Sequence, residues 1–232
     1  MRFIQCVLIL LLAGLINSCG LVKTVYNNSL EALGWWLDGY FDFTQTQKSI
    51  LNSALHRLHA WHRQNQLPSY ILTLQDLQKM VIKEHISANE ACEKMDGIRE
   101  NFSELQLESI PIIIEIAPLL SDEQLQHFQA KLEKRALKWK SEWWQETPEE
   151  QLEVRLDKIE SFAEKVYGTL SESQLAMLKQ NLAISSIKPA LAYAEILRRN
   201  EDVYQIVTAL HNQSLSTENK SQLVKQGFKR LK

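Results

Sequence analysis

Three histidines, His56, His59 and His62, follow one another at three-residue intervals in a segment with helical periodicity. Imidazole binds transition metals and transfers protons near neutral pH, so this spacing raises the question of a metal or proton-transfer site. At 100° per residue the three rings spread over an arc of about 120°, and they do not converge on one point. A closed metal site would need further ligands from another helix. We therefore expect a partly exposed polar face, with no metal or other cofactor bound.

A second group combines carboxylates, aromatic rings and His62. A carboxylate from Asp38 or Asp42 beside His62 could support acid–base chemistry. The alternative is a polar and aromatic lock that docks one helix on the next, because buried aromatic rings cover large areas and their polar ends find hydrogen-bond partners. The residues of this candidate functional cluster are Trp36, Asp38, Tyr40, Asp42, Trp61, His62 and Tyr70. We expect the structural role and no enzymatic activity, also because no hydrolase, metalloprotease or phosphate-binding motif occurs.

A third group places Trp139, Trp143 and Trp144 after a run of basic residues. Basic residues interleaved with tryptophan can suit a membrane interface or an extended polymer. Trp139 and Trp143 fall on the apolar stripe of the predicted helix, which favours ordinary packing for both. We expect Trp144 to be the exposed member.

Helices must position these residues, because apolar residues recur at three- and four-residue steps through most of the chain. The 232 residues include only seven Gly and five Pro, whereas all-β proteins need many Gly- and Pro-rich turns. Residues 109–118, SIPIIIEIAP, are ambiguous between a short buried helix and an extended connector. Helix starts are predicted at Thr44, Pro68, Ser87, Ser121, Thr147, Ser171 and Pro189. We predict one all-α domain over residues 31–232, a bundle or array of roughly seven to nine helices.

One pattern occurs three times: an apolar residue, Ser or Thr, two further residues and Gln. The segments are FTQTQ, LSDEQ and LSESQ, with the capping pairs Thr44 and Gln47, Ser121 and Gln124, and Ser171 and Gln174. A hydroxyl at the N-cap and a Gln three residues later form a reciprocal capping box, which any helical protein can use. The pattern also resembles the LTxxQ motif of small periplasmic stress chaperones, which are all-helical. The resemblance implies a chaperone-like role, and capping alone remains the other interpretation.

The N-terminus decides where the protein works. Arg2 precedes fourteen residues that contain one polar side chain, too few to span a bilayer as a helix but typical of a signal peptide. The following INSC resembles the lipobox of bacterial lipoproteins. This resemblance implies a signal peptide over residues 1–18, cleavage after Ser18 and a diacylglycerol thioether on Cys19. An ordinary secretory signal or an uncleaved anchor, with a chance cysteine, is the alternative.

A lipidated Cys19 would attach residues 19–30 to the membrane as a tether for the helical domain. Two or more acyl chains make such attachment stable. Gly20 follows the cysteine, where an Asp would signal retention in the inner membrane of enterobacteria. By this family-level rule we expect the outer membrane of the cell envelope, with the protein facing the periplasm.

Two blocks in the first third of the chain, WWLDGYFDFTQTQ and AWHRQNQLPSY, resemble those of a bacterial lipoprotein family of unknown function. The matching residues are Trp36, Leu37, Asp38, Tyr40, Asp42, Thr44, Gln47, Trp61, His62, Arg63, Leu67, Pro68 and Tyr70, and later Leu120, Ser121, Glu123, Gln124, Arg155, Gly168, Leu170 and Gln174. Phe43 replaces the family's common Leu. The resemblance implies an all-helical lipoprotein and brings no activity with it.

The net charge and the sequence motifs indicate which classes of partner to expect. The formal net charge of −2 gives no electrostatic reason to expect nucleic acid. We expect a membrane-anchored envelope lipoprotein that binds protein partners or clients without catalysis, in a chaperone-like or stress-associated role. One alternative is an assembly subunit of one specific envelope complex. Another is an enzyme on an envelope substrate that uses the region of His62, Asp38 and Asp42.

Overall fold

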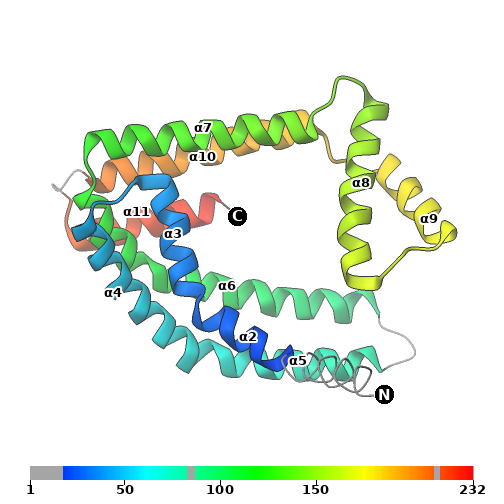
Figure 1. Ribbon diagram of the computed structural model, residues 1–232, viewed down its shortest axis with the longest axis horizontal. Coiled ribbons are helices and arrows are strands. Elements are labelled where there is room, and N and C mark those ends of the chain that lie inside the picture. The colour runs from blue at the N-terminus through cyan, green and yellow to red at the C-terminus, as the bar shows by residue number, and fades with distance from the viewer. Residues whose placement is uncertain (1–17, 83–86, 212–214, 232) are drawn as a thin grey trace, which may run out of the picture. The chain divides into compact units, whose positions relative to one another are not determined.

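The computed structural model describes residues 18–82, 87–211 and 215–231. The predicted signal peptide therefore lies outside the described residues up to position 17. Every regular element in the described ranges is helical, which confirms the all-α prediction (Figure 1). The α-helices are α2 (Ser18–Asn27), α3 (Ser29–Phe41), α4 (Gln45–Trp61), α5 (Leu67–Val81), α6 (Ala88–Ile116), α7 (Asp122–Trp143), α8 (Pro148–Tyr167), α9 (Glu172–Ala183), α10 (Pro189–His211) and α11 (Thr217–Arg230). A π-helical turn, η1 (His62–Gln66), and a 3₁₀ turn, η2 (Ala117–Leu119), complete them.

The described residues form two compact units. Unit 1 takes in residues 1–120 and 213–225, and unit 2 takes in residues 121–212 and 226–232. Helix α11 thus belongs to unit 1 by its first part and to unit 2 by its end. The prediction of a single domain over residues 31–232 stays a prediction.

In unit 1, α2 and α3 run antiparallel to α4. Three contacts along α4 mark this course: Asp38 lies against Lys48, Gly34 against Leu55, and Tyr26 against His59. The apolar face predicted for α4 is buried, since Leu51, Ala54 and Leu55 are each at most 3% exposed. Helix α6 packs on α4, and its last turns add Ile110 and Ile116 to this core.

The isoleucine-rich segment is helical. Helix α6 includes Pro111 and runs to Ile116, so this segment continues a long helix and forms neither the short separate helix nor the extended connector that the sequence left open. Proline inside a helix removes one hydrogen bond and costs about 3 kcal/mol in an exposed helix. Burial of Ile110 and Ile116 on the same helix offsets this cost.

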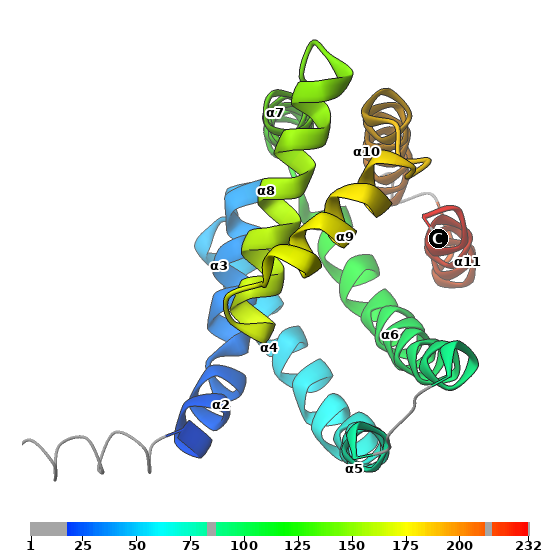
Figure 2. The same ribbon diagram turned by 90° about the vertical axis from the view of Figure 1, so that its right-hand side faces the viewer.

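In unit 2, α7 and α10 pack against each other along their length (Figures 1 and 2). Their shared core contains Leu125, Phe128, Leu132 and Ala136 of α7 and Ile206, Val207 and Leu210 of α10. Asn200 Nδ2 also donates to the backbone oxygen of Leu132 at 3.1 Å, which fixes the axial position of one helix on the other.

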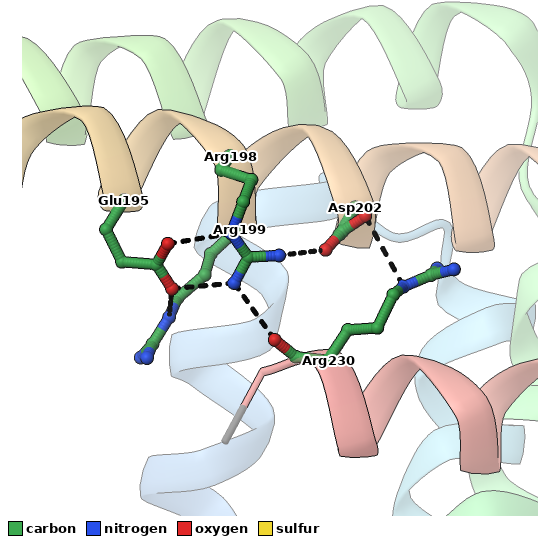
Figure 3. A network of polar contacts seen from close by, with 5 residues as sticks. All are labelled: Glu195, Arg198, Arg199, Asp202 and Arg230. Carbon is green, nitrogen blue, oxygen red and sulfur yellow. Dashed lines mark hydrogen bonds and ion pairs between the residues drawn. The ribbon is translucent and has the colours of Figure 1, made fainter.

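The end of α11 joins α10 through charges. Arg198 pairs with Glu195 and Asp202 on its own helix, and it donates to the backbone oxygen of Arg230 at 2.9 Å (Figure 3). Arg230 in turn lies 3.5 Å from Asp202, while Arg199 shares Glu195. Arg198 thereby satisfies a carbonyl that the C-terminus of α11 leaves open. The final segment, ambiguous in sequence between a weak helix and a basic tail, is helical in residues 217–230.

Candidate functional site

Four aromatic and imidazole rings meet where α4 ends, and we call Tyr26, His59, His62 and Tyr70 the ring cluster. Tyr26 Oη lies 2.9 Å from His62 Nδ1, at hydrogen-bonding distance. The Tyr26 ring centroid is 4.6 Å from that of His59, and the His62 and Tyr70 centroids are 5.5 Å apart. The cluster therefore ties α2 to the junction between α4 and α5.

The backbone of this junction is unusual. Residues 62–66 form the π-helical turn η1, so α4 passes into α5 without a loop, and His62 lies at the transition. Gln66 at its end is 1% exposed and is fully hydrogen-bonded by two neighbours: its Nε2 donates to the backbone oxygen of Asn101 at 2.6 Å, and its Oε1 accepts from Tyr70 at 3.1 Å. Single π-turns inside helices often occur at functional sites. Here the turn also directs Gln66 toward α6.

Burial sets the protonation states of the ring cluster. It lowers the pKa of His62, and the neighbouring His59 lowers it further, so the neutral imidazole is favoured. Burial raises the pKa of the Tyr26 phenol, against an opposing effect of Arg63. Burial, then Glu104 and Tyr26, raise the pKa of Tyr70. Tyr26, His62 and Tyr70 are thus uncharged at neutral pH.

The predicted functional cluster is divided between the two ends of α4. His62 and Tyr70 belong to the ring cluster, whereas Asp38 is held at the other end. Its Oδ2 lies 2.9 Å from Lys48 Nζ, and its Oδ1 accepts from the backbone N–H of Phe43 at 2.9 Å. Fourteen residues of helix separate Lys48 from His62, about 21 Å. The arrangement therefore does not bring the Asp38 carboxylate to His62.

Of the other predicted members, Asp42 lies in the turn between α3 and α4, Trp36 and Tyr40 lie on α3, and Trp61 lies at the end of α4. Asp42 adopts the left-handed conformation with φ 49°, and its N–H donates to the backbone oxygen of Asp38 at 2.8 Å. Trp36 and Tyr40 contact each other on α3 with centroids 4.8 Å apart, and Trp36 stays 49% exposed. Trp61 is half-buried near the end of α4. Lys48, with desolvation opposing it, lowers the pKa of Asp38, so this carboxylate stays charged in its ion pair.

The histidine spacing does not produce a metal site. No group of three or more His, Cys, Asp or Glu side chains in the described ranges is arranged to hold a metal ion. His59 Nε2 is buried and lacks a hydrogen-bond partner among the described residues. Its ring instead packs on Tyr26.

The three repeated motifs all form capping boxes. In each, the hydroxyl accepts from the Gln backbone N–H and the Gln side chain accepts from the N-cap N–H. Gln47 and Gln124 are buried, whereas Gln174 is exposed. Gln47 Nε2 also donates to the backbone oxygen of Leu119 at 2.5 Å, which binds the first motif to the residue just before the second. Capping thus accounts for the hydroxyl and the Gln in all three.

Helices α8 and α9 of unit 2 pack against each other as a hairpin (Figure 2). Much of the apolar surface of this hairpin is exposed. Among its described side chains only Leu182 is buried, and four apolar residues that recur at helical spacing along α8 are only partly covered: Leu152, Leu156, Ile159 and Ala163. The side chain of Val166 lies outside the described ones. Large apolar groups of the hairpin and the turn after it remain in solvent: Phe162 (69% exposed), Tyr167 (80%), Met177 (64%) and Ile184 (79%).

An aromatic joint connects α7 with α10. The rings of Trp139 and Trp143 stack with centroids 6.1 Å apart, and Tyr193 stacks on Trp139 at 6.3 Å. Trp144 meets Tyr193 edge-on and is 37% exposed, as predicted for this tryptophan. Lys140 Nζ lies 5.0 Å from the Trp144 ring centroid. Packing rather than ligand binding explains this group, since each ring has a ring or cation neighbour.

Sequence reasoning missed Tyr26. It lies in the segment expected to be a tether, which is helical from residue 18, and no motif marks it. Cys19, the residue predicted to be lipidated, lies in the first turn of α2. Its side chain is outside the described ones, so lipidation stays a prediction. Cys92 is exposed and free. Within residues 18–82, 87–211 and 215–231, no helix has both the length and the apolar composition that crossing a membrane requires.

Comparison with known proteins gives one match. The model of DUF6279, a family of unknown function, matches residues 39–226. No curated protein matches the chain. A search of solved structures also finds no match. The family match takes in α4 to α10 and, of the predicted cluster, Tyr40, Asp42, Trp61, His62 and Tyr70, whereas Trp36 and Asp38 precede it. Because the match covers most of the chain, the protein belongs to this family of unknown function.

Proposed function

We propose that this protein is a lipid-anchored protein of the bacterial cell envelope that binds other proteins in a chaperone-like manner. Acylation of Cys19 would hold it at the outer membrane, facing the periplasm. The observation that carries the binding role is the open α8–α9 hairpin, which leaves Phe162, Met177 and Ile184 in solvent. Large apolar side chains exposed on one small hairpin support a role in an interaction.

The hairpin suits a polypeptide partner. Two packed helices with a partly covered apolar face can accept a third helix or an extended apolar segment on that face. Met177 and Phe162 add flexible and aromatic contact area, and methionine-rich surfaces adapt to different partners. This adaptability supports several clients over one fixed partner.

Catalysis is not part of the proposal. The enzyme alternative needs a carboxylate beside His62, and Asp38 is bound to Lys48 at the opposite end of α4. His62 instead has a phenol as its hydrogen-bonding neighbour. A phenol with a raised pKa and a neutral imidazole form a stable neutral pair and hold no activated nucleophile.

In-cell photo-crosslinking tests the proposal. A photoreactive residue replaces Phe162 or Met177, and matched controls carry it at Glu164 or Lys179, which lie 200° around the same helices. A ladder of many envelope proteins at the first two positions, absent at the controls, supports chaperone-like binding. One dominant adduct would identify an assembly subunit in its place. Equal or no crosslinking at the hairpin and control positions would refute protein binding by the hairpin.

The anchor has its own test. Mass spectrometry of the N-terminal peptide should find cleavage after Ser18 and acyl chains on Cys19, and fractionation should place the protein in the outer membrane. Cys19→Ser should release it from the membrane fraction. An unmodified Cys19 would remove the anchor from the proposal without affecting the crosslinking result.

A further inference from the structure

We propose that unit 1 has a second membrane contact beside the lipid: a surface of α2, η1 and the first half of α5 that lies on an anionic phospholipid bilayer. We call it the anchor corner and define it as residues 19–27 and 62–75. The inference rests on the lipidation of Cys19 proposed above.

The ring cluster places the lipid at this corner. Tyr26 is joined to His62 at 2.9 Å and stacks on His59, so the end of α2 is fixed to η1. Cys19 precedes Tyr26 by seven residues on the same helix, about 10 Å along its axis. Acyl chains on Cys19 would therefore enter the bilayer about two helical turns from Tyr26 and the ring cluster, which brings the anchor corner close to the headgroups.

The charged residues of the corner itself have one sign, although the carboxylate of Glu104 on α6 lies close enough to Tyr70 to raise its pKa. Residues 17–30 and 43–75 contain no Asp or Glu, and their cations are Lys23, Lys48, Arg57 and Arg63. Lys48 and Arg57 are neutralised by Asp38 and Glu115. Lys23 and Arg63 are exposed, and the Arg63 guanidinium lies over the Tyr26 ring, 5.8 Å from its centroid. Exposed cations next to a membrane anchor are attracted to anionic headgroups.

The corner also exposes apolar groups. Val25 of α2 is 62% exposed, and on α5 Ile71, Leu72 and Leu74 are 54%, 64% and 64% exposed. The carboxylate nearest in sequence, Asp76, is paired with Lys94 of α6 at 2.9 Å, which offsets its charge. An apolar face with flanking cations is the composition of helices that lie in the membrane interface.

The lipid makes even a weak contact effective. Because Cys19 would hold the anchor corner at the bilayer, its contact with the headgroups is intramolecular in effect and benefits from a high local concentration. A single attachment point would let unit 1 rotate about the tether, whereas a second contact would fix the orientation of unit 1 at the bilayer.

Depth-dependent quenching tests the inference. The acylated protein, in a Cys92→Ser background, carries an environment-sensitive fluorophore on a cysteine placed at Leu72, and is reconstituted into vesicles of phosphatidylethanolamine and phosphatidylglycerol with doxyl-labelled lipid. The matched control carries it at Leu137, which is 60% exposed on α7 of unit 2. We expect a blue-shifted emission and at least a twofold quenching at Leu72, with neither at Leu137.

Two changes probe the basis of the contact. Lys23→Glu combined with Arg63→Glu should remove most of the quenching at Leu72 while acylation persists, and vesicles of phosphatidylcholine alone should reduce it. Equal quenching at Leu72 and Leu137, or none at Leu72 on acylated protein, would overturn this inference and leave the proposed function standing. Absence of acyl chains on Cys19 would overturn the anchor and this inference together, and the crosslinking at the hairpin would still report on protein binding.

Discussion

Tyr26→Phe isolates the hydrogen bond that joins α2 to the rest of unit 1. The substitution removes the hydroxyl 2.9 Å from His62 Nδ1 and keeps the ring, whose centroid is 4.6 Å from that of His59. A neutral intramolecular hydrogen bond contributes about 0.5–1.5 kcal/mol. We therefore expect the free energy of opening α2 to fall by about 1 kcal/mol, with little change in the core formed by Leu51, Ala54 and Leu55.

Native-state hydrogen–deuterium exchange measures this local opening. A loss of about 1 kcal/mol corresponds to roughly fivefold faster exchange of the α2 amides, and the range above to about twofold to tenfold. Amides of α7 in unit 2 should keep their rates. The matched control is Tyr167→Phe, which removes a hydroxyl from a side chain that is 80% exposed and should change nothing. Unchanged exchange of α2 in Tyr26→Phe would refute the role assigned to this bond.

Acid should weaken the same attachment. Burial and His59 lower the pKa of His62 in the folded protein, so folding favours the neutral ring. Its contribution to stability is then complete above the unfolded pKa of about 6.5 and is lost as the pH falls through the lower folded pKa. Exchange of α2, corrected for the intrinsic pH dependence, should accelerate between neutral pH and about pH 5. In His62→Gln, which cannot titrate, this acceleration should disappear, and its persistence would assign the pH effect to another group.

Three further predictions concern the motifs, the core and the ion pairs of α10. Gln47→Ala removes a capping box and the bond to the Leu119 oxygen, whereas Gln174→Ala removes an exposed box alone. Urea unfolding should therefore show that Gln47→Ala lowers the free energy of unfolding by about 1 kcal/mol more than Gln174→Ala, and equal losses would contradict the extra bond. Leu210→Ala, at a side chain with no exposed surface, should destabilise unit 2 by about 2–5 kcal/mol in the same assay. Arg198 and Arg199 lower the pKa of Glu195 to about 2, so its stabilising effect is complete above pH 4.5 and is lost from there toward pH 2. Thermal unfolding of Glu195→Gln should therefore depend less on pH across this interval, and an unchanged acid limb would contradict the assignment.

The helix starts could be predicted from the sequence because their signals are local. Thr44, Ser87, Ser121, Thr147 and Ser171 each cap a helix and form a reciprocal box with the residue three positions later. Such a box needs four consecutive residues and no tertiary contact. Gly168 likewise ends α8 with φ 78°, a conformation that glycine adopts without strain.

The Ile-rich end of α6 and the π-helical turn could not be predicted in this way. Pro111 and five Ile favour a break or a strand locally, and burial against α4 overrides that preference. The turn η1 depends on Gln66, whose side chain bonds a backbone oxygen 35 residues away. Contacts over such distances in the sequence leave no periodic signal.

The candidate cluster was divided for a related reason. Its two blocks, around Asp38 and around His62, are near each other in the sequence. They lie at opposite ends of α4, which has 17 residues and is about 25 Å long. One block fixes α3 to the start of this helix through Lys48, and the other fixes α2 to its end through Tyr26. The two blocks thus fix two different helices to the two ends of α4. The contact at His62 holds α2, the helix that carries the proposed lipid site at Cys19, and would therefore set the orientation of unit 1 relative to the lipid without forming a catalytic group.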